Sequence, residues 1–134
     1  MIEADILKNY RKVAIIGLSA NEEKASNKVG KYLIQHGFDV FPVNPVESEI
    51  LGKKAYPNLT AITDSIEIVD IFRKSEDVEP IIDEAIRIGA KVVWMQEGVK
   101  NEAAAAKARQ AGLLVIMDKC MKKTHENLTK QGII

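Results

Sequence analysis

The chain has 134 residues, of which 46% are hydrophobic and 28% charged, and its 19 acidic side chains balance its 19 basic ones. This length suits one folded domain over residues 1–134, while the composition excludes general disorder and the zero net charge disfavours nucleic-acid binding. With one cysteine, no basic leader and apolar runs far shorter than the ~20 residues of a membrane span, we expect a soluble, cytoplasmic protein without membrane contact.

Hydrophobic periodicity predicts short strands that alternate with amphipathic helices. In chain order we expect a helix over 2–10, a strand over 13–17, a helix over 27–36, a strand over 39–43, a loop with one short turn over 46–59, a short helix or turn over 60–65, a strand over 66–72, a helix over 78–88, a strand over 91–95, a helix over 101–111, a strand over 113–117 and a helix over 121–129. Five apolar strands separated by helices predict an α/β fold, a mostly parallel five-stranded sheet covered on both faces.

The first strand leads into the most informative loop of the sequence. Ligands of open α/β sheets bind outside the carboxyl ends of the strands, and the start of the following helix is suited to anions. In this loop Gly17 and Leu18 leave the strand, and Ser19, Lys24 and Ser26 offer hydroxyl groups and a positive charge. The sequence therefore predicts an anion site here. The alternative is that Gly17 only permits a tight turn and Ser26 only caps the helix.

Two common nucleotide sites are excluded by the residues at the strand ends. The loop after Gly17 lacks the second glycine of a P-loop, and Ser19 occupies the position of the second glycine in a dinucleotide fingerprint. Asn44, followed by Pro45, stands where nicotinamide enzymes usually place a carboxylate on the ribose. The predicted site is therefore Rossmann-like but differs from that of an ordinary NAD enzyme.

A set of short motifs follows the strands in order. They are Gly17-x-Ser19 with Lys24 and Ser26, Val43-Asn44-Pro45, Val69-Asp70-Ile71-Phe72-Arg73, Trp94-Met95-Gln96-x-Gly98 and Asp118-Lys119-Cys120. Together these motifs resemble the small stand-alone CoA-binding proteins, which are similar to the N-terminal CoA-binding domain of the succinyl-CoA synthetase α subunit. The resemblance covers about 12–125. Glu97 and Lys119, the latter where arginine is common, depart from the family's pattern.

The resemblance implies a Rossmann-like fold that binds CoA or an acyl-CoA. It implies phosphate contacts between residues 17 and 26 and further contacts at Asn44, Pro45, Phe72 and Arg73. Lys74, Gln96 and Gly98 complete the candidate binding residues, because they follow strands at the same edge of the sheet. Trp94, which lies within a strand, is expected in the core.

The strand ends carry no paired acid and base, no catalytic triad and no set of metal ligands. We therefore expect non-catalytic binding of CoA, with no catalytic and no metal-binding residues. The alternative is an enzyme that uses the same pocket, either an NAD(P)-linked oxidoreductase or a CoA-dependent acyl transferase. Cys120 is the sole nucleophile candidate, and we expect it to be structural. The sequence leaves open whether a protein partner exists.

Overall fold

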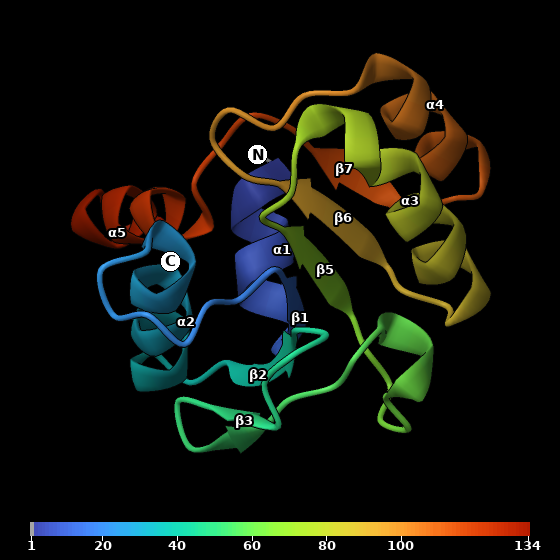
Figure 1. Ribbon diagram of the computed structural model, residues 1–134. Helices are drawn as coiled ribbons and strands as arrows, with labels where there is room; N and C mark the ends of the chain where they lie inside the picture. The colour runs from blue at the N-terminus through green and yellow to red at the C-terminus, as the bar shows by residue number, and fades with distance from the viewer. Residues whose placement is uncertain (1) are drawn as a thin grey trace.

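A five-stranded parallel sheet forms the centre of the computed structural model, which describes residues 2–134. The strands lie in the order β2-β1-β5-β6-β7, and every neighbouring pair is parallel (Figure 1). Their bounds are β1 (Lys12–Ile16), β2 (Asp39–Val43), β5 (Ile68–Ile71), β6 (Val92–Met95) and β7 (Leu114–Ile116). The predicted fold class is confirmed, and the strand bounds agree with the expected ones to within two residues.

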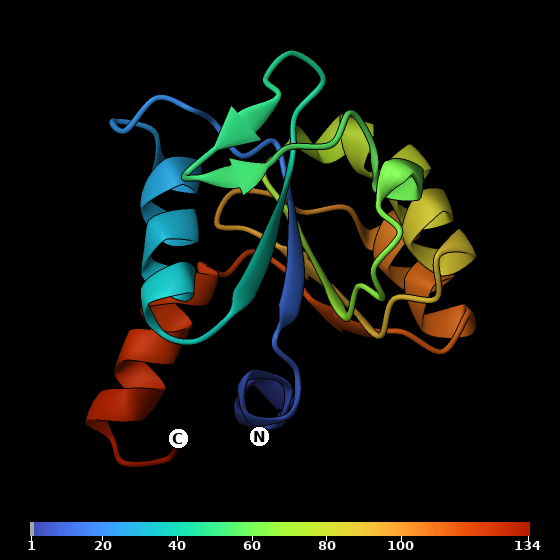
Figure 2. The same cartoon turned by 90° about the horizontal axis from the view of Figure 1, so that it is seen from below.

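Helices cover both faces of the sheet (Figure 2). The helices α1 (Ile2–Asn9), α2 (Ala25–Gln35) and α5 (Met121–Lys130) pack on one face, and α3 (Val78–Arg87) and α4 (Glu102–Gln110) pack on the other. The short helical turns η1 (Leu59–Ala61) and η2 (Ser75–Asp77) complete the helical elements. None of the helices within residues 2–134 is long and apolar enough to cross a membrane.

Successive residues of each strand contribute to different cores, because their side chains point to opposite faces. In β1, Val13 and Ile15 pack under α1, α2 and α5, whereas Ala14 and Ile16 pack under α3 and α4. Trp94 of β6 belongs to the first core and is fully buried, as its position within a strand predicts. Both faces of the sheet are therefore buried, which is why the sequences of its strands are continuous apolar runs.

One local prediction was wrong. Residues 46–59 contain a small antiparallel hairpin, β3 (Glu49–Ile50) and β4 (Lys53–Lys54), instead of a loop with one turn. Leu51 and Gly52 connect its strands with φ of 54° and 73°, and a leucine in that conformation gives no turn signal in the sequence. In the opening helix, Ile2 is 42% exposed and Ala4 is buried.

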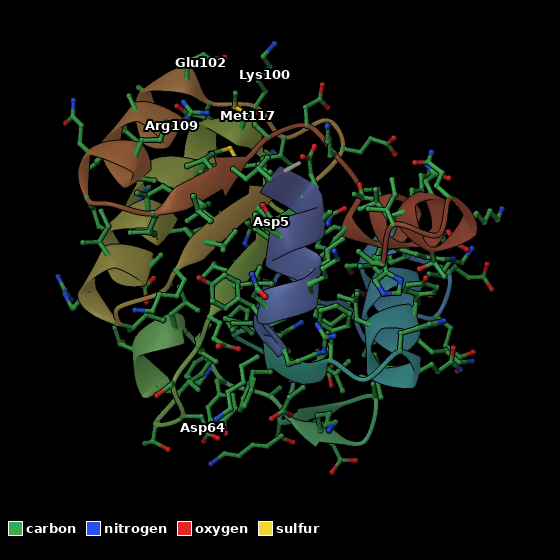
Figure 3. All side chains as sticks on the ribbon, turned by 180° about the vertical axis from the view of Figure 1, so that it is seen from behind. Asp5, Asp64, Lys100, Glu102, Arg109 and Met117 are labelled. Atoms are coloured by element: carbon green, nitrogen blue, oxygen red, sulfur yellow. The ribbon has the colours of Figure 1, made fainter. Side chains whose placement is uncertain are left out.

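Side chains tie the loops together where the strands end. Asn101 caps α4, because its Oδ1 accepts from the N–H of Ala104 at 2.9 Å. Its Nδ2 also donates to the carbonyl of Ser75 at 2.9 Å. The N–H of Asp118 donates to the carbonyl of Val99 at 3.2 Å, which joins the loops after β7 and β6 near Lys100 and Met117 (Figure 3). Hydrogen bonds therefore link neighbouring loops at the carboxyl edge of the sheet.

Candidate functional site

The strand order fixes where a ligand site is expected. From β1 the chain turns to β2 on one side, and later to β5, β6 and β7 on the other. The point at which the direction reverses lies between β1 and β5, at their carboxyl ends. Gly17 follows β1 there, and Phe72 and Arg73 follow β5.

Gly17 brings the ends of β1 and β5 into direct contact. Its φ is +83°, and a Cβ placed on it would lie 2.3 Å from the carbonyl oxygen of Phe72. The same Cβ would lie 3.2 Å from Nη1 of Arg73, so the exposed guanidinium group extends over the glycine. Glycine is required here because the carbonyl group of Phe72 and the side chain of Arg73 occupy the space that a side chain at position 17 would need. One positive charge thus stands at the beginning of the loop over residues 17–26.

The loop over residues 17–26 is held by its own polar groups. The N–H of Ser19 donates to Oγ of Ser26 at 3.0 Å, and Nδ2 of Asn27 donates to the carbonyl of Ser19 at 2.9 Å. Ser26 and Asn27 are buried, and their side chains form hydrogen bonds that hold the loop in place. Ser26 does not cap α2. Leu18 is fully buried as well, which leaves only its backbone near a ligand.

The start of α2 offers free donors beside this loop. The N-cap residue Lys24 makes no capping hydrogen bond with its side chain, which is exposed. Among residues 2–134, the first N–H of the helix to find a carbonyl is that of Lys28, which donates to Lys24 at 3.2 Å. The preceding N–H groups of the first turn point out of the helix end, where they attract an anion.

Asn44 holds the end of β2 against the end of β1. Its Nδ2 donates to the carbonyl of Leu18 at 3.1 Å, and its Oδ1 accepts from the N–H groups of Val46 and Glu47 at 2.8 and 3.1 Å. The amide is therefore occupied by the two loops, and the neighbouring Pro45 is exposed. Because β1 lies between β2 and β5, Arg73, which follows β5, lies beside Gly17 at the end of β1. It does not lie beside Asn44 at the end of β2.

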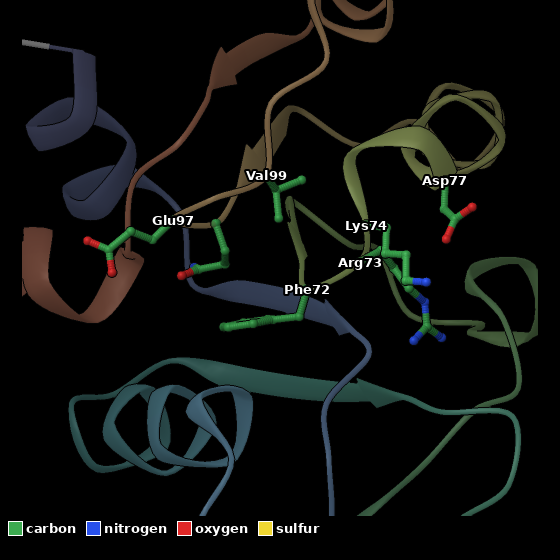
Figure 4. Close-up of a pocket in the computed structure, with 7 residues that line it drawn as sticks. Phe72, Arg73, Lys74, Asp77, Glu97 and Val99 are labelled. Atoms are coloured by element: carbon green, nitrogen blue, oxygen red, sulfur yellow. The ribbon is translucent and has the colours of Figure 1, made fainter.

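A pocket of about 500 Å³ opens beside Phe72 (Figure 4). Phe72 extends across it, with Arg73, Lys74 and Asp77 on one side and Glu97 on the other. The lining residues come from the ends of β5 and β6, namely Phe72, Arg73, Lys74, Asp77, Gln96, Glu97 and Val99. Four predicted site residues, Phe72, Arg73, Lys74 and Gln96, are thus brought together around an apolar floor with a basic side.

Gln96 leads to a buried acid that has no role in the sequence-based prediction. Nε2 of Gln96 donates to Oδ1 of Asp70 in β5 at 2.6 Å, and both side chains are buried. Burial raises the pKa of Asp70 to about 7, against the lowering effect of the hydrogen bond from Gln96. The signal that could have found Asp70 is an acid in the middle of an apolar strand.

The residues after β6 and β7 bind one another. The N–H of Gly98 donates to Oδ1 of Asp118 at 2.7 Å, so Gly98 connects two loops and lies outside the lining of the pocket. Glu97 forms an ion pair with Lys123 of α5 at 3.0 Å, and Lys119 pairs with Glu3 of α1. Both departures from the family's pattern are therefore matched by an opposite charge, and the acid beside the pocket is partly neutralised.

The histidines lie away from the pocket. His36 stacks on Tyr32 of α2 with a centroid distance of 3.9 Å, and the hydroxyl of Tyr32 lies 2.7 Å from Nδ1 of His125. Burial lowers the pKa of His125. Cys120 is half-buried at the N-cap of α5. None of these side chains belongs to the residues that line the pocket beside Phe72.

Comparison with known proteins gives a consistent set of relatives. Residues 11–126 match a family model described as a CoA binding domain. Protein YneT of Bacillus subtilis is 37% identical over 121 residues, which cover 90% of both chains. A protein of known structure from Pyrococcus horikoshii is 44% identical, with a TM-score of 0.93 over 96% of this chain and 90% of that one.

A larger relative matches this chain over one part of its own length. The α subunit of the ADP-forming acetate–CoA ligase II of Pyrococcus furiosus is 29% identical over 92% of this chain. The chain spans only 30% of the length of that subunit. The remaining length of the subunit has no counterpart in the matched region.

Proposed function

This chain belongs to the family of CoA-binding domains, and from that membership we propose that it binds coenzyme A or an acyl-CoA without catalysing a reaction. The family match spans nearly the same residues as the predicted resemblance, which it confirms. The observation that carries the proposal is the guanidinium group of Arg73 over Gly17, at the beginning of the loop that leads to the free N–H groups of α2. A phosphate needs such a combination of charge and backbone donors.

The two ends of the ligand use different parts of the site. The phosphates lie at the loop over residues 17–26, within reach of Lys24, Arg73 and Lys74. The pantetheine arm lies along Phe72 in the pocket, whose other wall is Gln96. This arrangement is supported by the lining of the pocket, which combines an apolar floor with two basic side chains, beside Asp77, at one end. Asn44, Leu18 and Ser26 act by holding the loops in place.

Non-catalytic binding is supported by the position of the reactive side chains. General acid–base or nucleophilic catalysis needs a base within hydrogen-bonding distance of the reacting group. The pocket-lining carboxylates Asp77 and Glu97 are exposed, and Glu97 is paired with Lys123. Both histidines pack with Tyr32, away from the pocket. The chain's part is then to hold CoA for a reaction or a partner elsewhere.

Calorimetric titration with CoA, dephospho-CoA and NAD tests the proposal. We expect CoA to bind about ten- to a hundredfold more tightly than dephospho-CoA, because the 3′-phosphate adds a charge-assisted contact. CoA should also bind more tightly than NAD. Tighter binding of NAD would favour the oxidoreductase alternative, and acyl transfer from acetyl-CoA to added acceptors would favour the transferase. Either result would contradict the proposal.

Replacement of Arg73 by alanine should weaken CoA binding. Loss of one charge-assisted contact costs about 1.5–3 kcal/mol, which corresponds to about a ten- to hundredfold higher Kd in calorimetry. The matched control is Arg109→Ala. Arg109 is an exposed arginine in the last turn of α4, at the end of this helix that lies away from the carboxyl edge of the sheet (Figure 3). Equal affinities of the two variants would remove Arg73 from the site.

A further inference from the structure

Asp70 is an acid placed among hydrocarbon side chains in the centre of the sheet. In the strand register it lies opposite Ile15 of β1 and Trp94 of β6. Because these residues share its face, its carboxyl group stands between two fully buried apolar side chains. Asp70 itself has no exposed surface. An apolar residue would fill this position as Ile68 does two residues earlier on the same face.

The carboxyl group has one partner. Oδ1 accepts from Nε2 of Gln96 at 2.6 Å, while Oδ2 has no hydrogen-bond partner among residues 2–134. A buried polar atom without a partner costs stability, and an apolar side chain of similar size is often tolerated better. The fold alone does not account for this acid. Its single contact is with a residue that lines the pocket.

The hydrogen bond with Asp70 determines which end of the Gln96 amide faces the pocket. Oδ1 of Asp70 accepts in this hydrogen bond, so it selects the NH₂ group of the amide. The carbonyl oxygen Oε1 is then turned away from Asp70, and no group within residues 2–134 donates to it. Gln96 thus presents Oε1 to the pocket as a hydrogen-bond acceptor, and the hydrogen bond with Asp70 holds its orientation.

We propose that Asp70 is a positioning residue, which holds Gln96 so that its Oε1 accepts a hydrogen bond from an N–H or O–H group of the ligand. This inference rests on the proposed function, in which the pantetheine arm lies along Phe72. The arm carries two amide N–H groups, and Gln96 accepts from one of them. Without Asp70 the amide of Gln96 rotates freely and presents either end to the ligand.

The experiment uses three variants of the full chain and two ligands. Asp70→Leu removes the carboxyl group, Gln96→Met removes the amide, and the double variant replaces the pair by apolar groups. CoA is compared with adenosine 3′,5′-bisphosphate, which has the nucleotide end of CoA and lacks the pantetheine arm. Calorimetry gives the Kd of each combination, and circular dichroism establishes that each variant is folded.

Each single variant should bind CoA about three- to tenfold more weakly and bind adenosine 3′,5′-bisphosphate as the wild type does. The double variant should lose no more than either single variant, since both act through one contact. If Asp70→Leu does not fold, Gln96→Met and the double variant still test the contact.

The outcomes separate this inference from the proposed function. Unchanged CoA affinity in Gln96→Met would overturn the inference while leaving CoA binding intact. A parallel loss of adenosine 3′,5′-bisphosphate binding would also overturn it, because the pair would then support the whole site. A wild-type protein that binds neither ligand would contradict the proposed function itself.

Discussion

Gly17→Ala is expected to destabilise the protein by about 2–6 kcal/mol. Alanine at a φ of +83° costs about 1–3 kcal/mol of backbone strain. Its Cβ would also lie 2.3 Å from the carbonyl oxygen of Phe72, and relief of such overlap within packed structure costs a further 1–3 kcal/mol, roughly. Because the displaced atoms belong to the ends of β1 and β5, the change should weaken CoA binding as well. Urea denaturation measures the first effect, and calorimetry measures the second.

Gly112→Ala is the matched control for this prediction. Gly112 has a φ of +89°, and a Cβ placed on it would meet no atom within 4 Å. This variant therefore carries only the strain of the positive φ, about 1–3 kcal/mol, without the added cost of the overlap. It lies between α4 and β7, at the opposite edge of the sheet from the site, and should bind CoA normally. Equal losses of stability in the two variants would show that the approach of Phe72 to Gly17 is unimportant.

Periodicity predicted the sheet and its helices because each strand here is buried on both faces. The apolar runs that become β1, β5 and β6 have no polar face, so parallel strands under two layers of helices were the consistent interpretation. The hairpin of β3 and β4 was missed for the opposite reason. Its strands have two residues each, and the turn at Leu51 depends on contacts that no local pattern encodes.

The candidate site was predictable only to the level of the strand ends. The rule that ligands bind at the carboxyl edge selects Gly17, Arg73 and Gln96 without a structure, and the family resemblance adds Phe72. It does not tell which of these face a ligand and which hold loops. Asn44 illustrates the limit, because its amide is used by the carbonyl of Leu18 and the turn after it. Such division of roles depends on the strand order, which the sequence left undetermined.

Stability should depend on pH through Asp70. In the fold the pKa of its carboxyl group is raised from 3.8 to about 7, chiefly by burial. Between these values the folded protein binds a proton that the unfolded chain releases. The contribution of this group to the free energy of unfolding is therefore fully present below about pH 4, falls as the pH rises toward 7, and stays constant above that. Each unit of pKa shift corresponds to about 1.4 kcal/mol.

The comparison of wild type with Asp70→Asn isolates this contribution, since asparagine does not titrate. Urea denaturation between pH 5 and pH 8 should show the variant gaining about 2–3 kcal/mol relative to the wild type as the pH rises. Glu3, whose pKa is lowered mainly by its hydrogen bond with Lys119, acts with the opposite sign but cancels in the difference. Asp64→Asn removes one exposed negative charge and controls for the change in net charge (Figure 3). A difference between wild type and Asp70→Asn that stays constant with pH would mean that Asp70 does not take up a proton on folding. Gln96 would then face a carboxylate throughout this range.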